Sequence, residues 1–232
     1  MDALRLAVVA IDDGEFAVQV HVNEVEVTSR GAGLGMDPYD LLVPHNLLDA
    51  IDGTEVGLAR CGCGDDGCRR TGVVVSRDRH LVRWDWRGDV PMQEPATFDA
   101  GEYAQELHRA ATEHGWETPE RRAGRLVLTQ LDRAVLASYG LEPRGRPHDD
   151  AEGRFLTVPL AYRSGVYHVF VHVAWDGRDP EEVAAELCRR LLTTPPHEWS
   201  ATWWAPGRSA PPAIARGRWL REPRPVGAGG RG

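Results

Sequence analysis

The hydrophobic residues of the first hundred positions recur at every second residue, which is the spacing of β-strands. The alternation runs through residues 4–8 and 16–22, and the turn-forming sequence Asp12-Asp13-Gly14 separates the two runs. This pattern predicts a β-hairpin. The same alternation predicts further short strands at residues 56–60, 72–77 and 81–86, so we expect the N-terminal half to form an antiparallel β-meander.

Helical spacing replaces strand spacing after residue 98. Asp99 and Glu102 have the spacing of a capping box, which predicts that a helix begins there. Thr118 followed by Pro119 predicts the start of a second helix, and the apolar stripe extends that helix to Gly140. The chain then returns to strands at 154–162 and 166–175, and it ends its regular structure with a helix that begins near residue 180.

This order of elements predicts an α+β fold, with a β-meander, a helical pair, and then a β-hairpin and a C-terminal helix. A doubly wound sheet is disfavoured because the βαβ alternation that produces parallel strands is missing. We interpret residues 1–98 as a β-rich region and 99–207 as an α+β region, either separate from the first or continuous with it. Residues 208–232, rich in arginine and glycine, are expected to form a basic and mostly disordered tail.

Charge limits the partners that the chain can be expected to bind. The net charge is −8, and all 27 basic residues are arginines. Six of them lie in the predicted tail, so residues 1–207 carry 21 arginines against 34 acids. An acidic body repels nucleic acid, which makes nucleic acid an unlikely partner, and another protein is the partner that we expect.

The lengths of the hydrophobic runs also indicate where in the cell the protein is expected. None approaches the roughly 20 apolar residues that are needed to span a bilayer, and the first residues lack the pattern of a secretory signal. We therefore expect a cytoplasmic protein without a membrane segment. In that compartment persistent disulfides are rare.

The clearest chemical signal is the sequence RCGCGDDGCRR, which contains Cys61, Cys63 and Cys68. Short cysteine spacings allow one turn to direct several thiolates at one ion, and the glycines of this loop give the chain the freedom to bend around it. The three cysteines are therefore candidate zinc ligands. One alternative is a glycine-rich turn without metal, which has free thiols or an adventitious disulfide between Cys61 or Cys63 and Cys68. The other is a reactive thiol next to Arg60, Arg69 and Arg70.

The sequence does not identify a fourth zinc ligand. The predicted strands place His80 too far from the loop, and Cys188 falls on the apolar stripe of the last helix, where a buried thiol is expected. Four other residues remain candidates, through the loop itself, the returning strand or a tertiary contact: Asp65, Asp85, His21 and His45.

The segment LARCGCGDDGCRRTGVVVSRDRHLVRWDW resembles a unit of about 30 residues found in bacterial proteins that have no assigned reaction. In that unit a Cys-x-Cys-Gly-x-x-Gly-Cys loop is followed by a valine-rich strand and a Val-x-Trp strand. The resemblance implies that the loop lies on a β-hairpin. It implies no catalytic role and leaves metal binding open.

Two other groups of residues are candidates for chemistry or binding. His168 and His172 share one face of a predicted strand about 13 Å apart, which is too far for one metal ion but allows a cleft between them. The tryptophans and arginines near the C-terminus are expected to form a flap that packs onto the sheet. The chain is thus expected to be a non-enzymatic interaction or regulatory protein, and the alternative is a hydrolase or thiol-dependent enzyme that uses the cysteine loop or a His168/His172 cleft.

Overall fold

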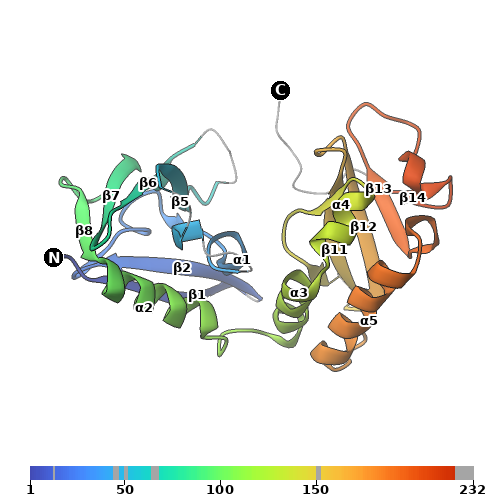
Figure 1. Ribbon diagram of the computed structural model, residues 1–232, viewed down its shortest axis with the longest axis horizontal. Coiled ribbons are helices and arrows are strands. Elements are labelled where there is room, and N and C mark those ends of the chain that lie inside the picture. The colour runs from blue at the N-terminus through green and yellow to red at the C-terminus, as the bar shows by residue number, and fades with distance from the viewer. Residues whose placement is uncertain (13, 44–46, 50–51, 64–67, 150–152, 223–232) are drawn as a thin grey trace. The chain divides into compact units, whose positions relative to one another are not determined.

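The structure, a computed structural model, describes residues 1–12, 14–43, 47–49, 52–63, 68–149 and 153–222 (Figure 1). It confirms the α+β class, with strands first in the chain and helices set against antiparallel sheets. The chain divides into two units, Met1–Trp116 and Glu117–Gly232. No helix in the described part of the chain is both long and apolar enough to cross a membrane.

The first unit contains two antiparallel sheets. One sheet has the order β1 (Leu4–Asp12), β2 (Glu15–Val22) and β3 (Val25–Glu26). The other follows the chain through β4 (Leu34–Gly35), β5 (Thr54–Arg60), β6 (Arg70–Arg77), β7 (Leu81–Gly88) and β8 (Ala96–Asp99). Met36 links the two sheets, because its carbonyl accepts the Val18 amide at 2.8 Å and its amide donates to Leu58 O at 3.0 Å.

The short α1 (Pro38–Leu41), the 3-10 helix η1 (Leu47–Asp49) and α2 (Ala100–Thr112) complete this unit. The α2 helix starts as predicted, because the Asp99 side chain accepts the amides of Gly101 and Glu102. Tyr103 then enters the core beside Trp84 and Phe98. Its hydroxyl accepts the Trp84 Nε1–H and donates to Leu48 O, so this buried polar group is satisfied on both sides.

The α2 helix also closes the edge of β1. Glu106 accepts the Leu6 amide at 2.6 Å, and Arg109 donates to Leu6 O at 2.5 Å. The two side chains thereby supply the hydrogen bonds that a neighbouring strand would make, which protects an exposed edge. Because α2 packs on β1, β7 and β8, it belongs to the first unit, and the unit boundary lies after Trp116 rather than after residue 98 as we predicted.

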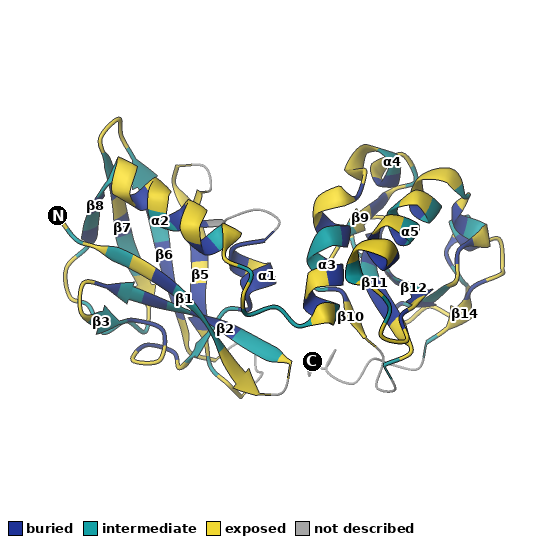
Figure 2. Ribbon diagram, turned by 90° about the horizontal axis from the view of Figure 1, so that it is seen from below, coloured by how far each residue is buried: buried dark blue, intermediate teal, exposed yellow. Residues whose placement is uncertain are grey.

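The second unit packs α3 (Pro119–Gln130) and α5 (Pro180–Thr193) against one face of a mixed sheet, and the buried residues gather between these layers (Figure 2). The sheet has the order β10 (His148–Asp149), β11 (Phe155–Tyr162), β12 (Tyr167–Ala174), β13 (Ala201–Trp204) and β14 (Leu220–Arg221). The short β9 (Leu141–Pro143) pairs with β11, and the 3-10 helix η2 (Pro196–Glu198) precedes β13.

One local prediction for this unit was wrong. The predicted long helix is interrupted between α3 and α4 (Arg133–Ser138), because Asp132 caps α4 by accepting the amides of Ala134 and Val135. Pro159 lies within β11, which has partner strands on both sides. The Pro159 carbonyl accepts a hydrogen bond from the Arg144 amide. Proline has no N–H, but its nitrogen is directed toward the segment between β9 and β10, so no hydrogen bond between paired strands is lost.

The predicted tail is folded as far as the described residues extend. Residues 208–222 include the 3-10 helix η3 (Ala213–Ala215) and β14, which pairs in parallel with β13. Trp219 is buried and stacks on Trp199 with the ring centroids 6.3 Å apart, as expected for a flap that packs onto the unit. The prediction of a mostly disordered segment was therefore wrong for 208–222, and it lies outside the described residues for 223–232.

Candidate metal centre

The cysteine loop joins β5 to β6, so Cys61 and Cys68 come from opposite sides of a hairpin. The Cys61 amide donates to Arg69 O at 2.9 Å, and Arg60 pairs with Arg70 one step further into the ladder. Cys63 folds back toward Cys61, because its amide donates to Cys61 Sγ at 3.4 Å. The hairpin neck thus holds three cysteines that the sequence separates by up to seven positions.

The three Sγ atoms lie within 4.8 Å of one another, close enough to bind a metal ion. Thiolates in a tetrahedral site with bonds of about 2.3 Å lie about 3.8 Å apart, so each sulfur would move inward by about 0.6 Å at most. Rotation of the side chains can supply such a shift. All three are free thiols, with Cys61 half-buried and with Cys63 and Cys68 exposed.

The surroundings of the sulfur atoms shift the pKa values of Cys61 and Cys68 in opposite directions. The Cys63 amide, followed by the Cys63 and Cys68 thiols and by Arg69, holds the pKa of Cys61 below its usual range. The Arg69 amide lowers the pKa of Cys68, but hydrogen bonds with the Cys61 and Cys63 thiols outweigh it, so that pKa is raised. Cys61 is therefore the first of these two thiols to ionise.

Arg69 anchors the hairpin neck to two other segments. Its Nε donates to the Asp89 carboxylate at 2.6 Å, and its Nη2 donates to Gly31 O at 3.1 Å. Thr71, fully buried, accepts the Ala32 amide and donates to Asp89 O. These hydrogen bonds fix the start of β6 to Asp89 and to the loop at 28–33, which lies directly against it. We call this bonded region the base of the cysteine hairpin.

Most of the predicted fourth ligands do not approach the sulfurs. Asp85 lies opposite Val74, six positions beyond Cys68, and pairs with Arg83, so the expectation that the returning strand brings it to the loop was wrong. His80 lies at the far end of β6 from the loop, as predicted. Within the described part of the chain, the cluster consists of the three cysteines alone.

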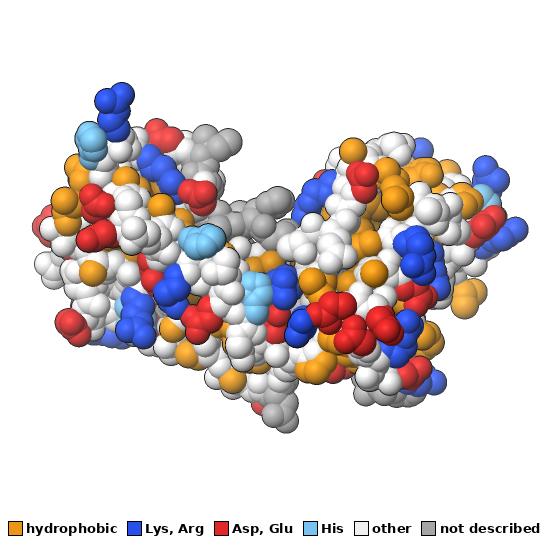
Figure 3. Space-filling model, turned by 60° about the horizontal axis from the view of Figure 1, so that its bottom comes forward, with side chains coloured by type: hydrophobic (Ala, Val, Ile, Leu, Met, Phe, Trp, Pro, Cys, Tyr) orange, Lys and Arg blue, Asp and Glu red, His pale blue; other side chains and the backbone are white. Residues whose placement is uncertain are grey.

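Of the remaining candidates, His45 and Asp65 lie outside the described residues. His21 lies on β2 in the other sheet, where it pairs with Arg5 and Glu26. It lines an open groove of about 870 Å³ with Arg5, Glu106 and Arg109 among its neighbours. Acidic and basic side chains are interspersed over the face seen in Figure 3, and the groove likewise contains both signs of charge.

Sequence reasoning missed Asp89, the carboxylate that does lie at the hairpin neck. In the β6–β7 hairpin Arg77 pairs with Val82 and Thr71 pairs with Gly88, so the next position brings Asp89 opposite Arg70. Its amide indeed donates to Arg70 O at 2.8 Å. Counting outward from the turn at 78–81 was the signal that could have found it.

His168 and His172, the pair singled out in the second unit, do not form a shared site. His172 Nδ1 and Nε2 lie 3.0 and 2.9 Å from the hydroxyls of Thr157 and Thr202, and Thr202 in turn donates to Glu222. His168 instead packs against Trp204, with ring centroids 5.2 Å apart. Burial, followed by the charge of Arg144, lowers the pKa of His168.

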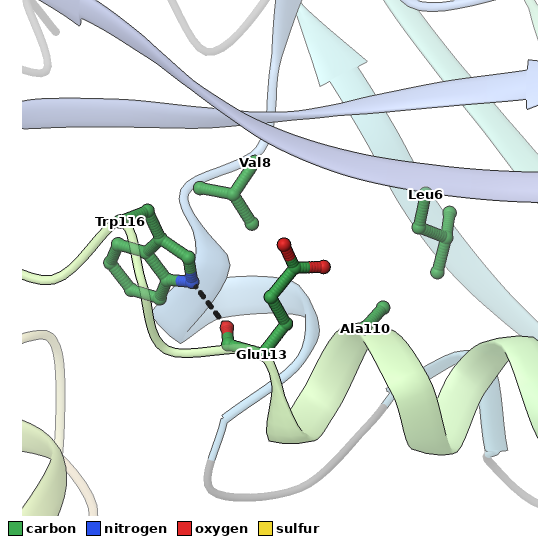
Figure 4. Close-up of a pocket in the computed structure, with 5 residues that line it drawn as sticks. All are labelled: Leu6, Val8, Ala110, Glu113 and Trp116. Atoms are coloured by element: carbon green, nitrogen blue, oxygen red, sulfur yellow. Dashed lines mark hydrogen bonds between the residues drawn. The ribbon is translucent and has the colours of Figure 1, made fainter.

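The fourth cysteine is separate from the cluster. Cys188 packs against the core of the second unit, as predicted, and burial raises the pKa of its thiol to about 11. A further cavity of about 50 Å³ in the first unit is lined by Leu6, Val8, Ala110, Glu113 and Trp116 (Figure 4). It has room for little more than a water molecule or two, and the Trp116 indole donates to Glu113 O beside it.

No protein-family model, curated protein or solved structure matches the chain significantly.

Proposed function

We propose that the protein is a cytoplasmic, non-enzymatic interaction or regulatory protein whose loop of Cys61, Cys63 and Cys68 holds a structural zinc ion. One observation supports the zinc site: the three Sγ atoms lie within 4.8 Å of one another. We call these three residues the cysteine cluster.

The chemistry of the donors favours zinc among the common metals. Three thiolates suit a borderline-soft ion, whereas magnesium and calcium prefer oxygen ligands. The amide of Cys63 directed at Cys61 Sγ stabilises a thiolate in the way that outer hydrogen bonds support metal ligands. Three thiolates around a divalent ion leave one negative charge, and the guanidinium of Arg69, which also pairs with Asp89, lies near enough to offset part of it.

Thiol catalysis fits the same residues less well. A nucleophilic cysteine works with a base that lies within hydrogen-bond reach. In the described part of the chain no histidine or carboxylate joins the cysteine cluster. His172 has both ring nitrogens next to threonine hydroxyls in the other unit, which argues for a structural network there.

The interaction role rests on charge. The first unit, which carries the cysteine cluster, contains 10 arginines against 21 acids. An acidic surface attracts basic partners and repels nucleic acid and anionic membranes. We therefore propose a basic protein as the partner of this unit, with the zinc ion fixing the hairpin at its surface.

The metal content of the purified protein tests the site. Wild-type protein is expected to hold one zinc ion per chain and to give intense thiolate bands after exchange with Co²⁺. The triple variant Cys61→Ser, Cys63→Ser, Cys68→Ser should hold none, whereas Cys188→Ser, the matched control for an unrelated thiol, should bind like wild type. Folded wild-type protein that takes up neither ion would contradict the proposal.

A further inference from the structure

We infer that the cysteine cluster is a peroxide-responsive redox site, in which a bound metal ion and an intramolecular disulfide that includes Cys68 are alternative states. The exchange between a metal-bound state and a disulfide state rests on the proposed zinc site. The formation of the disulfide does not, because it requires only the thiols that the hairpin places together.

Proximity is the first support. The three sulfurs lie within 4.8 Å of one another, so an oxidised sulfur meets a second thiol before it meets any thiol in solution. Cys68 lies across the hairpin neck from Cys61, whose amide bonds to the residue after Cys68. A bond to Cys68 therefore links the two sides of the neck, whereas Cys61 and Cys63 lie on the same side.

Exposure is the second support. Cys63 and Cys68 are exposed and Cys61 is half-buried, so a small oxidant reaches all three without opening the fold. Cys188 provides an internal contrast, because it is partly buried against the core of the second unit. Cys63 and Cys68 are thus more open to peroxide than Cys188 is.

The reaction balances with hydrogen peroxide as the oxidant. One thiolate sulfur attacks a peroxide oxygen, which forms an S–O bond, breaks the O–O bond and releases hydroxide that becomes water. A second thiolate then attacks the oxidised sulfur, which forms the S–S bond and expels the second oxygen as water. Two thiols lose two electrons, one peroxide is reduced to two waters, and one thiolate remains, which is too few ligands to keep a zinc ion.

The experiment uses the full chain in metal-free and zinc-loaded forms, exposed to graded hydrogen peroxide. The readouts are peptide mass mapping of the cysteines and release of zinc to a chromogenic chelator. In both forms we expect one disulfide within the chain that includes Cys68, formed at least about tenfold faster than any oxidation of Cys188. The loaded form should release its zinc as the disulfide forms, and a reductant should restore metal binding.

Variants distinguish the outcomes. Cys68→Ser should form no disulfide across the neck, while Cys188→Ser should behave like wild type. If the metal-free wild type gives only sulfinic or sulfonic acid, or disulfides between chains, the redox inference is wrong even if zinc binds. If the metal-free protein forms the disulfide but never takes up zinc, the redox site stands and the proposed zinc function fails.

Discussion

Replacing Gly31 with alanine tests whether the loop at 28–33 must lie directly against the base of the cysteine hairpin. A Cβ atom at this position would stand 2.3 Å from Thr71 Oγ1 and 2.7 Å from both Asp89 O and Val27 O. Carbon–oxygen contacts rarely shorten below about 3.3 Å. The substitution therefore forces displacements of about 0.6–1.0 Å, and two of the three obstructing atoms belong to the backbone.

The expected cost follows from overpacking, which typically destabilises a protein by about 1–3 kcal/mol. We expect Gly31→Ala to lower the free energy of unfolding of the first unit by about 2 kcal/mol and its melting temperature by about 8 °C. Because Arg69 donates to Gly31 O, the hairpin neck should loosen as well. Affinity for Co²⁺ should then fall about tenfold, as is typical when an outer contact of a metal site is disturbed.

Gly57→Ala is the matched control. Gly57 lies on β5 of the same hairpin, and a Cβ atom there would meet nothing within 4 Å. This variant should be as stable as wild type or more stable by up to about 1 kcal/mol. Urea unfolding and Co²⁺ titration of both variants give the comparison.

A double-mutant cycle locates the clash. Thr71→Ala removes the nearest obstructing atom, so Gly31→Ala should cost about 0.5 kcal/mol less in that background than in wild type. If Gly31→Ala unfolds with the same midpoint as Gly57→Ala, the close approach of the loop to the hairpin base does not exist in solution.

Three further predictions concern titratable groups. Cys188, with a pKa of about 11, should react with a disulfide reagent at pH 8 about 100-fold more slowly than an ordinary thiol, and equal rates for all four cysteines would disprove its burial. Glu106→Gln should destabilise the first unit by about 1–2 kcal/mol at pH 7, because it weakens the cap on Leu6. Burial raises the pKa of Glu106, but Arg109 and the Leu6 amide outweigh it and lower that pKa, so the loss should shrink as the pH falls below about 4.5, and a constant loss would refute this account. The pKa of His168 is lowered by burial and by Arg144, so the second unit should lose stability as the pH falls below about 6.5, and unfolding curves of His168→Phe should lack that part of the loss.

The sequence pattern predicted the strands well because a half-buried strand needs alternating side chains whatever its partners are. The runs at 4–8, 16–22 and 72–77 all lie within observed strands. The same pattern could not place the break between α3 and α4, since the apolar stripe continues past it. There the Asp132 side chain accepts hydrogen bonds from two backbone amides, which favours a new helix start over continuation of α3. The spacing of hydrophobic residues carries no information about such local hydrogen bonds.

The cysteine cluster was predictable because its members are close in sequence, and the β6–β7 register could have placed Asp89 near Thr71. The contact of Gly31 and Ala32 with this hairpin was not predictable, because only the tertiary fold brings the loop at 28–33 to it. Composition was a poorer guide at the C-terminal end. Arginine and glycine suggested disorder, but Trp219 is buried against Trp199 and β14 pairs with β13, and both contacts attach this segment to the second unit.

The folded C-terminal segment changes what the charge of the chain implies. Residues 208–222 belong to the second unit, which therefore contains 17 arginines against 14 acids, while the first unit contains 10 against 21. The excess of acid is thus a property of the first unit and not of the whole body. Attraction of a basic partner, and its loss at high salt, should follow that unit and the cysteine hairpin that it carries.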